Sequence, residues 1–126
     1  MRAVDTNVLV RLLARDDRKQ LAAAEEFVRG GAWVSHLVLM ETAWVLDSVY
    51  EVQPAAIAAA VEMLLDHEQL TVQDSDVVAA ALAQYRRRPS VGFSGCLILE
   101  VARKAGHLPL GTPDRELARL DGTLKL

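Results

Sequence analysis

The chain has 126 residues, of which 52% are hydrophobic and 5% are aromatic, and its formal net charge at pH 7 is −3. This length suits a single domain over residues 1–126 with a sizeable core, and leaves no room for a second. The charge excludes a generally basic surface, so nucleic-acid binding would depend on local patches or on phosphates bridged by metal. The few aromatic residues also disfavour a surface built for base stacking.

The sequence contains no run near the roughly 18 apolar residues that a membrane span needs, and Asp5 interrupts any signal-peptide core. A single cysteine, Cys96, excludes an intrachain disulfide and suits a reducing compartment, where it would be a small buried hydrophobic residue. We therefore expect a cytoplasmic protein without a membrane partner.

Short strands and helices alternate in the predicted order of elements, with Pro54 placed for a first helical turn, Ser94 for a cap and Gly106 for a stop. In chain order we expect a strand at 2–5, helices at 8–13 and 17–29, a strand at 32–35, the helix carrying Glu41, a helix at 54–67, a strand at 70–72, helices at 76–87 and 94–105, a strand at 108–111, a short helix at 115–120 and a strand at 123–126.

This alternation predicts an α/β fold with a parallel sheet covered by helices on both faces. Ligands gather at the carboxyl ends of the strands in such sheets. Asp5 ends the first predicted strand and Asp114 follows the fourth, so both carboxylates can reach one crevice. Each of them could instead simply cap the helix that follows it.

Glu41 lies in the middle of an apolar helical stripe formed by Leu37, Met40, Trp44, Val45 and Ser48. We expect this stripe to face the core, where an ionised carboxylate needs a cation or several hydrogen-bond donors. The alternative is a buried ion pair with an arginine such as Arg11 or Arg103. Trp33 and Trp44 are expected in the core or at a dimer interface.

Four segments resemble the PIN-domain ribonucleases, most closely the VapC toxins of bacterial toxin-antitoxin pairs, and the resemblance covers essentially the whole chain. Each motif is common by itself, but the four together in this order and spacing are specific. The segments are Asp5-Thr-Asn-Val-Leu, Leu39-Met-Glu-Thr-Ala-Trp-Val-Leu46, Phe93-Ser-Gly-Cys-Leu-Ile-Leu and Gly111-Thr-Pro-Asp-Arg-Glu-Leu117.

The resemblance implies a three-layer α/β/α PIN-like domain that acts as a metal-dependent endoribonuclease. Asp5, Glu41 and Asp114 match three of the family's acids, which hold one or two Mg²⁺ or Mn²⁺ ions. A hard cation held by carboxylates can neutralise the phosphoryl oxygens and activate water. The resemblance further implies an RNA substrate, a cognate antitoxin and a homodimer.

Gly95 stands where the family has its remaining acid, because the usual Asp-Phe-Ala-Asp segment appears here as Gly92-Phe-Ser-Gly95. Losing one carboxylate should weaken metal binding, so we expect this sequence to be impaired. The glycine arose either by natural drift or by a later change. We favour the later change, because the rest of the site is intact, and a glycine codon in the source genome would exclude it.

Further polar residues are candidates for supporting roles. Thr6, Asn7 and Thr112 could orient the carboxylates, and Arg11 and Arg15 could contact RNA, although a solvated face is the default for such arginines. The three histidines show no ligand spacing.

Two other functions compete with the nuclease. The first is a catalytically inactive PIN-fold protein that binds RNA or antitoxin, and restoring an aspartate at position 95 would discriminate between them. The second, a phosphatase with Asp5 as nucleophile, lacks the second acid that its motif needs, because Asn7 stands there.

Overall fold

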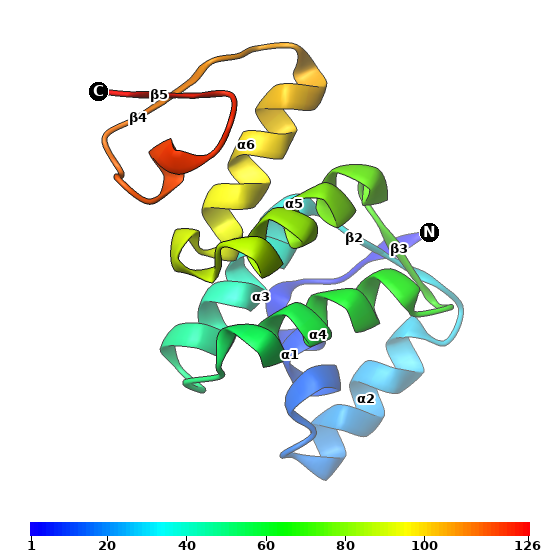
Figure 1. Cartoon of the computed structure of the whole chain (residues 1–126). Helices are drawn as coiled ribbons and strands as arrows, with labels where there is room; N and C mark the ends of the chain where they lie inside the picture. The colour runs from blue at the N-terminus through cyan, green and yellow to red at the C-terminus, as the bar shows by residue number, and fades with distance from the viewer. The chain divides into compact units, whose positions relative to one another are not determined.

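A computed structural model describes all residues, 1–126, and contains six α-helices and five short strands (Figure 1). The α/β class predicted from the sequence is confirmed. The elements are β1 (Arg2–Ala3), α1 (Thr6–Ala14), α2 (Arg18–Val28), β2 (Ala32–Val34), α3 (His36–Ser48), α4 (Pro54–Asp66), β3 (Leu70–Val72), α5 (Ser75–Arg87), η1 (Pro89–Val91), α6 (Phe93–Ala105), β4 (Leu110–Thr112), η2 (Leu117–Arg119) and β5 (Thr123–Lys125).

The strands form two parallel sheets. The first has the order β1-β2-β3, with Ala32 of β2 paired to Arg2 on one side and to Leu70 on the other. The second consists of β4 and β5, with Leu110 opposite Thr123. Parallel neighbours need a crossover connection, and helices provide it between the strands of the first sheet.

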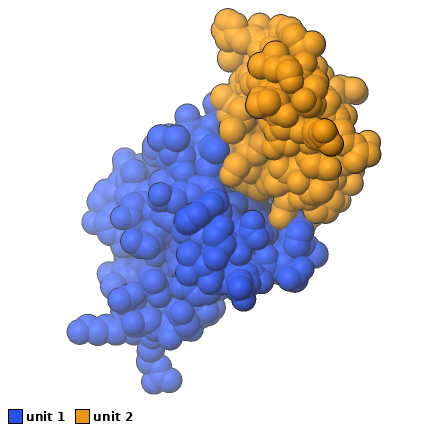
Figure 2. Space-filling model, turned by 90° about the vertical axis from the view of Figure 1, so that its left-hand side faces the viewer, with its two compact units in different colours: residues 1–75 blue, residues 76–126 orange.

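The chain divides into two compact units, Met1–Ser75 and Asp76–Leu126, coloured blue and orange in Figure 2. In the first unit α1 packs against α2 and α3, and α4 packs against α3 and β3. In the second unit Phe93 of α6 meets Tyr85 of α5 edge to face, with ring centroids 6.0 Å apart. None of the helices combines the length and hydropathy that a membrane span requires.

Local capping explains where most helices begin. The side chains of Asp5, Asp17 and Ser35 accept hydrogen bonds from the first turns of α1, α2 and α3, and Pro54 occupies the first turn of α4. The predicted Ser94 cap is wrong. Gly92 precedes α6 with φ at 86°, a value that glycine adopts readily, and so the helix already begins at Phe93.

The buried face of α3 is not the face that the apolar stripe predicted. Leu39, Thr42, Ala43 and Leu46 are buried, whereas Leu37 is 79% and Trp44 59% exposed. Glu41 is likewise exposed, so the expectation that it points into the core is wrong. The helix has apolar residues on both sides, and periodicity alone cannot choose between two such faces.

This assignment of the α3 faces predicts different costs for two truncations on the same helix. Leu39→Ala should lower the free energy of unfolding by about 2–5 kcal/mol, because it removes a fully buried side chain. Leu37→Ala should change it by less than about 0.5 kcal/mol. Urea unfolding of both variants measures this, and equal losses would contradict the buried face described here.

Candidate functional site

Thr6 links the first two acidic motifs, because it follows Asp5 in the chain and binds Glu41 through its side chain. Asp5 precedes α1, and its Oδ1 accepts a hydrogen bond of 3.3 Å from the backbone N–H of Val8. Thr6 is the buried first residue of α1, and its hydroxyl donates a hydrogen bond to Oε1 of Glu41. The first residue of α1, which follows Asp5 in the chain, therefore binds the carboxylate of Glu41 on α3.

The ion pairs considered for Glu41 do not form. The guanidinium of Arg11 lies 3.2 Å from Asp16, and that of Arg103 lies 3.2 Å from Glu100. Glu41 is exposed and not in the core, and its hydrogen-bond donor is the hydroxyl of Thr6.

Asp114 belongs to the second unit and caps a turn there. Its Oδ1 accepts hydrogen bonds from the backbone N–H groups of Glu116 at 2.8 Å and of Leu117 at 3.2 Å. Its own N–H donates to Oγ1 of Thr112, a buried residue at the end of β4, at 3.0 Å. Asp5 and Asp114 thus both serve as caps through Oδ1, and Oδ2 of each makes no hydrogen bond in the structure.

Gly95 lies beside the turn that Asp114 caps. It is the third residue of α6, and a Cβ added there would lie 3.3 Å from Cγ1 of Val91 and 3.6 Å from Cδ1 of Leu117. Leu117 is the residue whose N–H binds Asp114. The structure therefore brings the glycine and the Asp114 turn together, and a side chain at position 95 requires a small adjustment of its neighbours.

The remaining candidates line two separate hollows of the first unit. Asn7 and Arg11 line a groove of about 560 Å³ between α1 and α2. Arg15 lines a pocket of about 260 Å³ that also includes His67, and its guanidinium lies 3.9 Å from Glu25. The two arginines predicted to contact RNA consequently face different surfaces.

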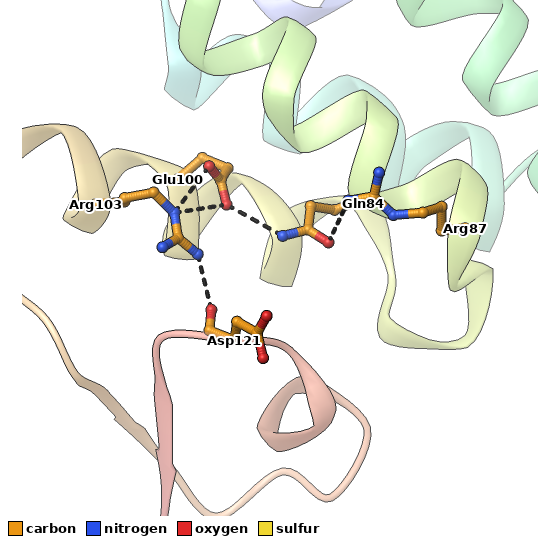
Figure 3. A network of polar contacts seen from close by, with 5 residues as sticks. All are labelled: Gln84, Arg87, Glu100, Arg103 and Asp121. Carbon is orange, nitrogen blue, oxygen red and sulfur yellow. Dashed lines mark hydrogen bonds and ion pairs between the residues drawn. The ribbon is translucent and has the colours of Figure 1, made fainter.

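A buried acid that the sequence analysis missed is Glu100, which is only 7% exposed (Figure 3). Nε of Arg103 donates to both of its oxygens, at 3.2 and 3.4 Å, and Gln84 donates to Oε2 at 3.5 Å. Arg103 also donates to the backbone oxygen of Asp121 at 2.8 Å. The spacing of Glu100 and Arg103, i and i+3 on one helix, was the available signal.

Cys96 lies next to this network and is fully buried. Burial raises the pKa of its thiol to about 11, and the negative charge of Glu100 adds to this effect while Arg87 opposes it. The thiol is therefore protonated at neutral pH and unsuited to act as a nucleophile.

Neither unit by itself contains three or more histidine, cysteine, aspartate or glutamate side chains grouped so that they could hold a metal. The candidate acids are divided instead, with Asp5 and Glu41 in residues 1–75 and Asp114 in residues 76–126.

Residues 2–123 match the PIN domain family, which is nearly the whole chain. The chain belongs to the PIN domain family. No curated protein and no solved structure matched it. PIN domains are generally nucleases of the hydrolase class, they generally bind RNA, and they typically use divalent metal ions. Membership of this family confirms the main part of the resemblance read from the four segments.

The capping role of Asp5 predicts that its stabilising effect depends on a side-chain oxygen and not on its charge. Asp5→Ala should lower the free energy of unfolding by about 0.5–2 kcal/mol, because the N–H of Val8 loses its acceptor. Asp5→Asn keeps an oxygen at the cap and should retain most of that stability. Thermal and urea unfolding of the pair measure the difference, and equal losses would contradict the capping role.

Proposed function

We propose that this PIN domain protein is a metal-dependent endoribonuclease of the VapC toxin type, and that Gly95 impairs the activity of this sequence. The observation that carries the proposal is the hydrogen bond from Thr6 to Glu41, which ties the second acidic motif to the residue that follows Asp5. The family match, which extends over both units, supports the nuclease class and the inclusion of Asp114.

Asp5, Glu41 and Asp114 are the residues that would hold Mg²⁺ or Mn²⁺. Their donors fit such an ion, because hard divalent cations prefer carboxylate oxygens. Oδ2 of both aspartates and Oε2 of Glu41 make no hydrogen bond, so one oxygen of each acid is available. When bound, the cation supplies charge neutralisation at the phosphoryl oxygens and an activated water.

The residues around these acids set their orientation. Thr6 directs one oxygen of Glu41, and Thr112 accepts the N–H of Asp114 and so fixes the turn that presents its carboxylate. Such outer hydrogen bonds tune the position and basicity of metal ligands. Asn7 lies exposed in the first turn of α1, where its amide can donate to a ligand or to substrate.

The other parts of the proposal concern partners and organisation. We propose RNA as the substrate, a cognate antitoxin, a homodimer, a cytoplasmic location and a single PIN domain made from both units. The exposed apolar side chains of Leu37 and Trp44 on α3, with Trp33 of β2 at 37% exposure, support a protein interface on the first unit.

A second candidate is a catalytically inactive PIN-fold protein that binds RNA or antitoxin without cleaving. The contacts around Gly95 favour it, because Val91 and Leu117 lie close to the position of an added Cβ, at 3.3 and 3.6 Å. Under this alternative the packing has adapted to the glycine, and an added carboxylate would not complete a working site.

Gly95→Asp tests the two candidates directly. We expect Mg²⁺-dependent RNA cleavage at least about tenfold above that of the unchanged protein, since removal of one electrostatic group at an active site typically costs a factor of this size or more. Gly95→Asn is the matched control, because it adds nearly the same volume without the charge. Cleavage is followed on labelled RNA, with thermal unfolding as a check on folding.

If the Gly95→Asp protein cleaves RNA and still does so after the further change Asp5→Asn, the result would contradict the proposed metal site. No cleavage by a folded Gly95→Asp protein would favour the binding protein instead.

A further inference from the structure

The groove between α1 and α2 has the size and the lining of a ligand site. It holds about 560 Å³, within the range of small-ligand pockets, which is roughly 300–1,000 Å³. Asn7 and Arg11 line it from α1, and Gln20, Ala23 and Phe27 line it from α2. These spacings place each set on one face of its helix, and α1 packs directly against α2.

The groups in the groove match the edges of a nucleobase. Ala23 and Ala24 line the groove, and the small side chain of the exposed Ala23 leaves room for a flat ring. The amides of Asn7 and Gln20 each offer donors and an acceptor, the combination that base edges require.

Positive charge is available at the same place. Arg11 forms an ion pair with Asp16, in which the side chains of Arg11 and Asp16 are 27% and 50% exposed, so solvent screens the pair in part and a phosphate can compete for the guanidinium. The guanidinium of Arg2 lies 4.0 Å from the centre of the Phe27 ring and donates to the Phe27 backbone oxygen at 3.1 Å. It holds the ring in place at the edge of the groove.

The groove also adjoins the acids of the first unit. Asn7 follows Asp5 by two residues at the start of α1, and Arg11 lies about 6 Å beyond Asn7 along the helix axis at 1.5 Å per residue. A strand that placed one phosphate at Asp5 could therefore place a neighbouring nucleotide along α1.

We propose that this groove binds a nucleotide of a single-stranded RNA substrate next to the phosphodiester that is cut. The inference rests on the proposed nuclease function and specifies its substrate. The base lies against Ala23 and beside Phe27, its edge meets Asn7 and Gln20, and Arg11 binds phosphate. A base in a duplex has its pairing edge occupied and its faces stacked, so only an unpaired base fits. An amphipathic protein helix prefers a groove without these polar groups.

The test compares two adjacent, exposed alanines of α2, of which only Ala23 lines the groove. The probe is a fluorescein-labelled, mixed-sequence single-stranded RNA of about ten nucleotides, within the range of single-strand site sizes, and EDTA prevents cleavage. Ala23→Phe fills the groove and should raise the Kd at least about tenfold, which corresponds to about 1.4 kcal/mol. Ala22→Phe should change it less than about twofold, as expected for a surface position.

The same RNA annealed to its complement should bind the unchanged protein about tenfold more weakly, since pairing occupies the base edge that Asn7 and Gln20 would meet. Circular dichroism confirms that both variants are folded. Replacing one nucleotide at a time with 5-iodouridine should give a photo-cross-link within residues 7–27.

Three results would overturn the inference. Equal RNA affinities for Ala23→Phe and Ala22→Phe would show that the groove does not bind RNA, and a protein partner would then be the expected occupant. Equal affinities for single strand and duplex exclude an unpaired base. If the unchanged protein does not bind RNA at all, RNA is also excluded as its substrate. Failure of the groove alone is distinguishable, because a Gly95→Asp protein would then cleave RNA with the same KM whether or not Ala23→Phe is present.

Discussion

The hydrogen bond from the Thr6 hydroxyl to Glu41 is the contact on which the candidate site depends. It joins the first residue of α1 to the middle of α3, two helices that pack together in the first unit. Thr6 is buried, so its hydroxyl needs a partner, and leaving such a group unsatisfied costs about 1–3 kcal/mol. The partner is the carboxylate of Glu41, so the stability of the buried hydroxyl ties Glu41 to the residue that follows Asp5.

The two capping aspartates have a structural role that is independent of the proposed metal site. Helix starts have backbone N–H groups without helical partners, and Asp5 and Asp114 each satisfy them with Oδ1. The second oxygen of each is held in place by the first. Gly95 adjoins the Asp114 turn through Leu117, so the position that lacks an acid belongs to the same local structure as one that has kept it.

Local signals predicted most of the fold, whereas long-range packing decided what they missed. Asp17 and Gly106 mark helix ends because capping depends on a few neighbouring residues, and both ends are confirmed. The face of α3 was predicted wrongly because both of its sides are apolar, and tertiary contacts selected the side with Leu39. The four motifs predicted the PIN family, which the match confirms. The roles of the individual acids are still predictions, because they concern a bound ion.

Anomalous scattering from crystals grown with Mn²⁺ would show whether acids from separate motifs hold one divalent cation. A proposal built on Asp5, Glu41 and Asp114 predicts a single strong peak at the manganese edge within coordinating distance of all three carboxylates. Gly95→Asp crystals should show the same peak with higher occupancy. A peak at other residues, or no peak near Glu41 in either protein, would contradict the account.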